Sequence, residues 1–203
     1  MTSVATDYIR LVLASASPRR KSLLEAAGIA FEIVESGIDE VRLDGEGGAD
    51  FALRMAREKV LNVSTRVPDA LVLAADTIVE CDGRILGKPI DAAEACSMLQ
   101  TLSGNTHTVV TAFAIASAGA ISESAPILSR VTFRPLSVEE IADYVATGQP
   151  LDKAGSYGIQ DAGAGFITQV EGERDNVMGL PVREVLEALR RHGIVTSPVK
   201  SSE

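Results

Sequence analysis

The sequence predicts an α/β fold built around a mixed sheet. Helical and strand patterns alternate through the first part of the chain, and a strand-rich stretch follows from Thr106. Hydrophobic residues make up 46% of the 203 residues and charged residues 23%, a composition typical of a globular chain with a sizeable core. Because no linker divides these patterns, we expect one folded unit over residues 1–195 and a disordered tail over residues 196–203.

The first expected elements are a buried strand over residues 11–14 and a helix that follows it. Ser17 suits the N-cap of this helix and Pro18 suits its first position. Gly28 suits the position after its last turn. These signals predict the helix boundaries.

Three cations, Arg19, Arg20 and Lys21, fall in the first turn of that helix. The helix dipole disfavours a cation there by about 0.3–1 kcal/mol, so an unpaired cluster should cost stability. A bound polyanion would reverse this, with Ser15, Ser17 and the two arginines contacting phosphate oxygens. A solvated helix start with surface arginines is the alternative, and the stretch matches neither of the common glycine-rich phosphate loops.

Strand and helix patterns then alternate over the next part of the chain. The pattern predicts a strand over residues 31–36, an acidic loop, a helix over 50–65 and an apolar strand over 70–76. A hairpin that turns at Asp82 and Gly83 follows this strand.

The apolar strand ends in Asp76 and Thr77, which would present a carboxylate at the carboxyl edge of the sheet, where ligands bind in open α/β folds. Such a carboxylate can hold Mg²⁺ or orient a water molecule, and Asp39 or Glu40 in the acidic loop is a candidate to share the ion. A turn-forming Asp76 and a solvated acidic loop are the alternatives.

Three further side chains are candidates for a binding site. Lys59 flanks the apolar face of its helix, from which it can reach solvent or a cleft. Lys88 lies between Gly87 and Pro89, and Gln160 lies in a glycine-rich loop where its amide could read a base edge. For Lys88 and Gln160, a solvated loop is the alternative.

The rest of the chain adds three strands, three helices and the glycine-rich loop. Asp91 with Glu94, and Ser137 with Glu140, are capping-box pairs that open the first two of these helices. The expected elements are a helix over 91–104, strands over 106–117 and 128–136, a helix over 137–148, a strand after the loop of residues 152–165, and a final helix over 180–194.

Composition argues against several functional classes. The net charge of −9 disfavours nucleic-acid binding, and no apolar run is long enough to span a membrane. The first residues lack the pattern of a secretory signal, and Cys81 and Cys96 have no metal-ligand spacing. We therefore expect a reduced, cytoplasmic protein that binds neither nucleic acid nor membrane.

Seven short motifs, taken together, resemble the Maf family of nucleoside triphosphate pyrophosphatases, historically called septum formation proteins. They span about residue 10 to residue 192, in the family's order: LASASPRR, AREK, AADTIV, GKP, LSGNTHTV, DKAGSYGIQ and VMGLP. The resemblance implies a fold similar to Maf and Ham1 (ITPase-like) proteins, with an elongated mixed sheet flanked by helices and a central cleft between two lobes. It also implies hydrolysis of a nucleoside triphosphate to the monophosphate and pyrophosphate, dependent on Mg²⁺ or Mn²⁺.

The resemblance assigns roles by motif position. Asp76 matches the family's catalytic acid or base, and Glu40 matches a carboxylate near the metal. The residues that match phosphate-contacting positions are Ser15, Arg20, Lys59 and Lys88. Whether Asp76 would act as base or as metal ligand stays open.

Three positions resemble the branch of the family that acts on dTTP and UTP, namely Arg19, Thr77 and Gln160. The charged run from Glu171 to Asp175 looks closer to the branch that acts on 7-methyl-GTP. A pyrophosphatase for a modified or purine nucleotide is therefore the first alternative. A non-catalytic nucleotide-binding regulator of septum formation is the second. Family members are often dimers, which implies a homodimer here.

Overall fold

The computed structural model describes residues 9–194, which form a seven-stranded mixed sheet covered by helices. The strand order is β2-β1-β3-β5-β6-β7, and β4 pairs with β3 outside this path. The strands are β1 (Leu11–Leu13), β2 (Glu32–Ile33), β3 (Leu71–Cys81), β4 (Arg84–Leu86), β5 (Thr106–Ser117), β6 (Ala120–Phe133) and β7 (Ile167–Glu171). Strand β1 pairs in parallel with β2 and β3, whereas the other pairs are antiparallel, so the predicted mixed α/β class is confirmed.

Six α-helices and three short 3₁₀ helices are present in the described part of the chain. The α-helices are α1 (Pro18–Ala26), α2 (Gly48–Ser64), α3 (Ala92–Leu102), α4 (Val138–Ala146), α5 (Arg174–Met178) and α6 (Val182–Arg191). The 3₁₀ helices are η1 (Gln149–Asp152), η2 (Ala154–Ser156) and η3 (Ala162–Phe166). No helix within residues 9–194 is both long and apolar enough to cross a membrane. The tail of residues 196–203 lies outside the described residues, so its disorder stays a prediction.

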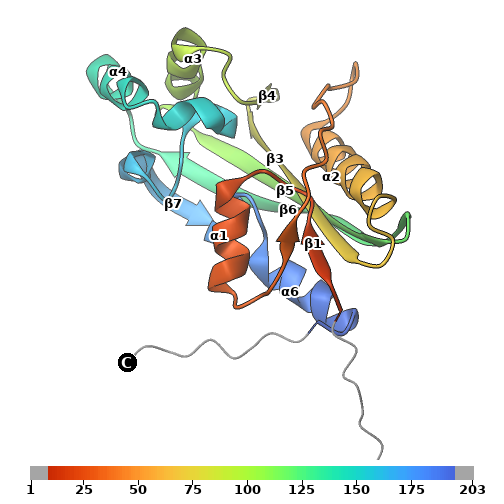
Figure 1. Cartoon of the computed structure of the whole chain (residues 1–203). Coiled ribbons are helices and arrows are strands. Elements are labelled where there is room, and N and C mark those ends of the chain that lie inside the picture. The colour runs from red at the N-terminus through yellow and green to blue at the C-terminus, as the bar shows by residue number, and fades with distance from the viewer. Residues whose placement is uncertain (1–8, 195–203) are drawn as a thin grey trace, which may run out of the picture.

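The two faces of the sheet are covered by different helices. Alternate residues of β3, such as Val72 and Ala74, pack with α2 into one core cluster. Their neighbours, such as Leu73 and Ala75, face the other side, where α1 and α6 cover one end of the sheet. Helices α3 and α4 cover the other end of that second face, and Figure 1 shows α2 standing apart from all of them.

Strand β3 corrects one expectation about Asp76. The strand does not end there but continues to Cys81, so Asp76 lies at its middle. The neighbouring strand ends instead: β1 pairs with β3 up to Leu73, and β4 begins to pair at Val79. Among the described strands, the edge of β3 between these points has no hydrogen-bonding partner, although its residues stay largely buried. Asp76 therefore lies beside a gap where its neighbour stops, and not at the end of its own strand.

The local signals for helix ends are confirmed at most positions. Helix α1 begins at Pro18 and Gly28 has a left-handed φ of 71°, although the Ser17 side chain makes no capping hydrogen bond. Helix α4 has the full capping box of Ser137 and Glu140. Asp91 caps α3 by accepting from the Glu94 amide. These interactions are local, which is why the sequence predicts them.

Three elements differ from the expected ones. Strand β6 begins at Ala120 rather than near residue 128, and it pairs with β5 along nearly its whole length. The polar residues at its start hide the strand pattern in the sequence, and this part of β6 is exposed or half-buried. The expected strand over 31–36 shortens to Glu32–Ile33. Helix α5, with five residues, is too short to give a helical pattern.

His107 is a buried histidine that packs in an aromatic cluster. Its side chain lies on β5, its Nε2 is 2.8 Å from the Tyr157 hydroxyl, and its ring meets Phe133 edge to face. Its Nδ1 has no hydrogen-bond partner among the described residues. Burial lowers the pKa of His107 to about 4. The folded protein therefore holds this imidazole neutral.

We expect acid to destabilise the fold through His107. Between about pH 6.5 and about pH 4 the unfolded chain binds a proton at this residue that the folded chain does not, so stability falls as the pH falls. The loss in unfolding free energy should reach about 2 kcal/mol at about pH 5. Urea denaturation near neutral pH and at about pH 5 would measure this loss in unfolding free energy. His107→Gln should remove this slope and His192→Gln, at the surface beside Ser122, should keep it; equal slopes for wild type and His107→Gln would contradict the assignment.

Candidate active site

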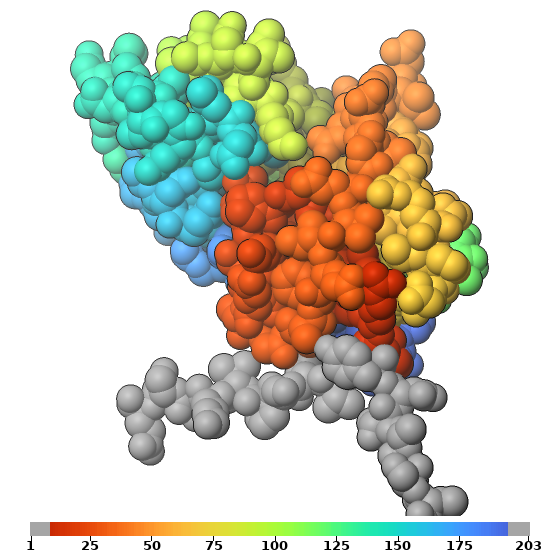
Figure 2. Space-filling view, in the orientation of Figure 1, coloured from red at the N-terminus to blue at the C-terminus, as the bar shows by residue number. Residues whose placement is uncertain are grey.

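A pocket of about 490 Å³ opens around the unpaired edge of β3. This volume suits a small-molecule ligand. Its walls come from the turn before α1, the loop before α2, the middle of β3, the loop after β4, and the segments from η1 to residue 160 and around Gly179. In Figure 2 the surface is notched between the orange segment before α2 and the green and cyan helical region. Segments distant in sequence thus meet at one site.

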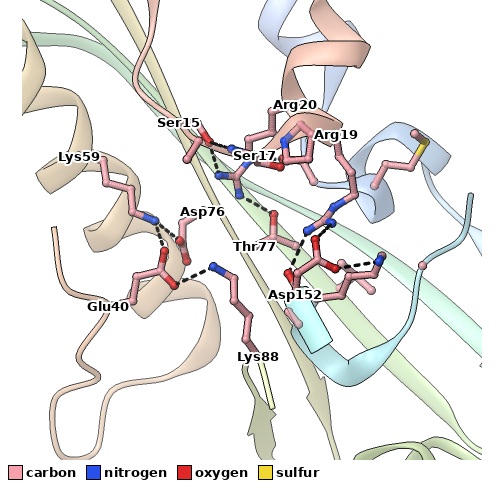
Figure 3. Close-up of a pocket in the computed structure, with 18 of the residues that line it drawn as sticks. Ser15, Ser17, Arg19, Arg20, Glu40, Lys59, Asp76, Thr77, Lys88 and Asp152 are labelled. Atoms are coloured by element: carbon pink, nitrogen blue, oxygen red, sulfur yellow. Dashed lines mark hydrogen bonds and ion pairs between the residues drawn. The ribbon is translucent and has the colours of Figure 1, made fainter. Parts of the chain in front are cut away.

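On one side of the pocket, Lys59 joins two carboxylates (Figure 3). Its Nζ lies 2.6 Å from Oδ1 of Asp76 and 2.6 Å from Oε1 of Glu40. The side chains of Lys59 and Asp76 are only 7% and 6% exposed, whereas that of Glu40 is 41% exposed. Helix α2 carries Lys59 on the face that packs against the even-numbered side of β3, which is why it reaches Asp76. The lysine points into the pocket, not to solvent.

The environment shifts the pKa values of Asp76 and Glu40 in opposite directions. Burial raises the pKa of Asp76, although the charges of Lys59 and Arg20 oppose this effect. Burial also acts on Glu40, but there Lys59, Lys88 and Arg20 together hold the pKa below its usual value. Two neighbouring carboxyl groups with separated pKa values are typical of a site that moves protons.

Arg20 lies across the pocket and binds three parts of the chain at once. Its Nε donates to the Gly179 carbonyl at 2.8 Å, its Nη1 donates to Ser15 Oγ at 3.0 Å, and its Nη2 donates to Thr77 Oγ1 at 3.2 Å. These bonds use three of the five guanidinium N–H donors, so two are left for a ligand. Burial lowers the pKa of Arg20, and Asp76 and Glu40 counter this effect.

The other two cations at the start of α1 also have partners, which corrects the expectation of an unpaired cluster. Arg19 donates to the Asp152 carboxylate at 2.6 Å and to the Asp152 carbonyl at 3.2 Å. The Nζ of Lys21 lies 3.7 Å from Oε1 of Glu25, which is one turn further along the helix. The cost of cations at a helix start is therefore offset within the chain itself.

The remaining candidates take different places. Lys88 lines the pocket with its side chain 59% exposed, and its Nζ is 3.8 Å from Oε2 of Glu40. Gln160 lines the pocket at an exposed position, and Asp39, beside Glu40, is exposed and does not line it. The charged run from Glu171 to Asp175 does not line the pocket either.

Two comparisons of the sequence identify its family. The family model described as Maf-like protein matches residues 10–192. The chain belongs to the Maf family. A relative from Geobacter sulfurreducens, named dTTP/UTP pyrophosphatase, is 46% identical over 187 residues, covering 91% of this chain and 97% of the relative. A protein of the same name from Myxococcus xanthus is 47% identical over 188 residues, covering 93% of this chain and 95% of the relative.

Solved structures similar to this Maf chain include Ham1 proteins. The HAM1 protein from Coxiella burnetii is 14% identical, with a TM-score of 0.48 over 91% of this chain and all of that one. The Ham1 protein from Staphylococcus aureus is 15% identical, with a TM-score of 0.48 over the same shares of the two chains.

The residues to which the resemblance assigns roles all line the pocket of this Maf chain. They are Ser15, Arg19, Arg20, Glu40, Lys59, Asp76, Thr77, Lys88 and Gln160. Sequence reasoning missed Asp152 and Lys153, which line the pocket in the same glycine-rich segment as Gln160. Their place at the start of DKAGSYGIQ was an available signal.

Proposed function

We propose that this Maf protein hydrolyses dTTP and UTP to the monophosphate and pyrophosphate. One observation carries the proposal: a buried carboxylate, Asp76, opens into the same pocket as Arg19, Arg20 and Lys88. A triphosphate needs cations to bind, and its hydrolysis needs a group that accepts a proton from water. The names of the relatives at 46% and 47% identity support the choice of dTTP and UTP.

These cations are distinctive because the chain as a whole is acidic. The chain carries a net charge of −9, yet its pocket contains two arginines and two further lysines besides Lys59. In a chain with an excess of acidic residues, basic side chains are not expected to gather in one pocket by chance. Their gathering therefore supports a polyanionic ligand. Arg20 suits phosphate best, since its two remaining N–H donors are held in place by three bonds to the chain.

Asp76 is the proposed general base. Water attacks the α-phosphorus in line with the bridging oxygen, a new P–O bond forms, and the bond to the β-phosphate breaks. Asp76 takes the water proton, and pyrophosphate leaves with the electron pair of the broken bond. A raised pKa makes Asp76 a stronger base than an ordinary carboxylate. Arg20, Lys59 and Lys88 stabilise the charge that develops on the leaving pyrophosphate.

The residues also fit a divalent metal ion. The Lys59 ammonium, itself a cation, touches both Asp76 and Glu40, so one cation can contact both carboxylates. Within residues 9–194 no group of three or more His, Cys, Asp and Glu side chains is arranged to hold a metal, so the other ligands would be phosphate oxygens and water. Bound Mg²⁺ or Mn²⁺ supplies charge neutralisation at the phosphates and lowers the pKa of a bound water. Asp76 and Glu40 are the residues that would hold it.

The proposed base-selecting residues are Arg19, Thr77 and Gln160. Arg19 and Gln160 belong to different segments of the pocket wall, and Asp152, in the segment that leads to Gln160, bonds to Arg19. Arg174 donates to the Ile159 carbonyl at 3.1 Å and so supports the loop that carries Gln160. We also propose a cytoplasmic location, supported by the free cysteines of the described chain, and the homodimer stays a prediction.

The test is pyrophosphate release by the purified full chain, with Mg²⁺, from a panel of dTTP, UTP, dCTP, GTP and 7-methyl-GTP. We expect dTTP and UTP to give the highest kcat/KM, and chelation of the metal to abolish release. Preference for a purine or methylated nucleotide would contradict the proposal that dTTP and UTP are the substrates. If folded protein binds these nucleotides but releases pyrophosphate from none of them, the proposed reaction is contradicted. That result would favour the alternative of a non-catalytic nucleotide-binding regulator.

A further inference from the structure

Helix α5 is followed by a backbone carbonyl that holds Arg20 in the pocket. The chain turns at Gly179, directly after the helix, with a left-handed φ of 117°. The Gly179 carbonyl accepts from Arg20 Nε at 2.8 Å, and the two other bonds of the guanidinium go to the hydroxyls of Ser15 and Thr77 (Figure 3). A hydroxyl can rotate to follow its partner, whereas a main-chain carbonyl cannot. The Gly179 carbonyl is therefore the acceptor that fixes the guanidinium.

The position of α5 depends on the sheet beneath it. A helix of five residues forms too few internal hydrogen bonds to be stable by itself. Three bonds connect it to β5 and β6. Asn176 Nδ2 donates to Ser129 Oγ at 3.0 Å, Ser129 Oγ donates to the Glu173 carbonyl at 3.1 Å, and Thr111 Oγ1 donates to the Asn176 carbonyl at 2.8 Å. The side chains of Asn176, Ser129 and Thr111 are all buried.

The direction of these bonds fixes the orientation of the Asn176 amide. Ser129 gives its one hydroxyl proton to the Glu173 carbonyl, so toward Asn176 it can only accept. The Val109 carbonyl, 3.4 Å from Nδ2, can also only accept. Both neighbours therefore require the NH₂ group, and Oδ1 is left without a hydrogen-bond partner among the described residues. A buried oxygen without a partner costs stability, which an apolar side chain at this position would avoid.

Asn176 also connects the sheet to the turn that binds Arg20. Its carbonyl, which accepts from Thr111, also accepts from the Gly179 amide at 3.1 Å. The path from β5 and β6 to the guanidinium therefore passes through Asn176. Neither Asn176 nor Ser129 lines the pocket, so each can act on a ligand only through the segment that it holds.

We propose that Asn176 and Ser129 are positioning residues that orient the Arg20 guanidinium to bind a phosphate group. This inference rests on the proposed role of Arg20 in phosphate binding. The guanidinium is planar, so a fixed Nε also sets the directions of the N–H groups that remain for a ligand. A hydrogen-bonded amide holds α5 in one position, whereas an apolar contact tolerates small shifts. This geometric requirement explains why the core keeps a polar side chain here despite its cost.

The test measures binding of inorganic pyrophosphate, with Mg²⁺, to the purified full chain by calorimetry. A misaligned guanidinium loses part of its charge-assisted bonds to phosphate, each worth about tenfold or more in affinity. We expect Asn176→Ala, which removes the amide, to weaken binding about tenfold, and Ser129→Ala, which removes one of its two acceptors, about threefold. Thermal melting shows whether each variant is folded.

Ser64→Ala is the matched control for Ser129→Ala. Ser64 is also a buried serine that donates to a main-chain carbonyl, that of Leu61 at 3.2 Å. It lies on α2, which covers the other face of the sheet from α5. We expect Ser64→Ala to bind pyrophosphate as wild type does.

A double-mutant cycle with Arg20→Ala separates positioning from a general effect on the fold. If Asn176 acts through Arg20, Asn176→Ala should weaken pyrophosphate binding when Arg20 is present and have no further effect in Arg20→Ala. A merely structural role would weaken binding by the same factor in both backgrounds. If Asn176→Ala does not fold, Ser129→Ala takes its place in the cycle, because the Glu173 carbonyl still accepts from the Val177 amide at 3.3 Å in that variant.

Equal factors in the two backgrounds would overturn the inference, as would wild-type binding by folded Asn176→Ala and Ser129→Ala. Failure of the proposed function gives a different result. If wild type does not hydrolyse dTTP but the cycle behaves as expected, the reaction is wrong and the positioning role stands. If dTTP is hydrolysed and the two factors are equal, the reaction stands and this role is wrong. If Arg20→Ala binds pyrophosphate as wild type does, or wild type binds none, Arg20 does not hold phosphate and this inference is wrong with it.

Discussion

Asp76→Asn should lower pyrophosphate release from dTTP by about a thousandfold, with the fold intact. The variant keeps the size of the side chain but removes the group that takes the proton from water, and loss of a general base costs about 10²–10⁴ in rate. It also removes one of the two proposed metal-binding carboxylates. Lys59 keeps Glu40 as a partner at 2.6 Å, so its ammonium is not left unpaired. Steady-state pyrophosphate release and thermal melting measure the two effects.

Asp39→Asn is the matched control for this variant. Asp39 is an exposed carboxylate next to Glu40 and does not line the pocket, so its loss changes the net charge equally and leaves the site unchanged. We expect its turnover to stay close to that of wild type. Turnover by Asp76→Asn close to that of wild type would show that another group takes the proton.

Lys59→Met should give the largest loss of stability among the pocket variants, about 3 kcal/mol in unfolding free energy. The methionine replaces the aliphatic stem but leaves the Asp76 carboxylate buried, with side-chain exposure of 6%, and without its ammonium partner. Urea denaturation near neutral pH measures the change. The double variant Lys59→Met/Asp76→Asn should recover most of the loss, because it removes the buried charge together with its partner.

Lys88→Met separates the stabilising role of a lysine from its proposed role in binding. Lys88 lines the same pocket but is 59% exposed and lies 3.8 Å from Glu40, so its loss should cost under about 1 kcal/mol. Both lysine variants should weaken triphosphate binding, whereas Lys59→Met should lower the unfolding free energy much more than Lys88→Met. If Lys59→Met is as stable as wild type, or if the double variant is no more stable than Lys59→Met, the inference that Lys59 stabilises the buried Asp76 carboxylate is contradicted.

Features that depend on neighbours in sequence were predictable. The start of α1 at Pro18, the hairpin at Asp82 and Gly83, and the capping box of Ser137 and Glu140 all appear as expected. Each of these results from contacts within a few residues, where backbone geometry and side-chain type decide the outcome. The mixed α/β class followed from the order of these elements.

The site was predictable only as a set of residues, not as an arrangement. The motifs shared with the Maf family pointed to Asp76, Lys59 and Glu40, but their spacing along the chain does not show that one ammonium binds both carboxylates. Nor does it show that β1 stops beside β3 and leaves the edge of β3 next to Asp76 without a partner strand. Strand pairing and helix packing decide such contacts, because they depend on which faces of distant elements share a core.

The sequence by itself determined the fold class, most helix ends, the Maf membership and nine of the side chains that line the pocket. The tertiary structure decided how those residues are paired and in which direction their hydrogen bonds run. Arg19 meets Asp152 across 133 positions of the chain, and Arg20 meets Gly179 across 159. Local propensity acts over a few residues, whereas a buried charge or hydroxyl takes its partner from whatever the folded chain brings within hydrogen-bond distance.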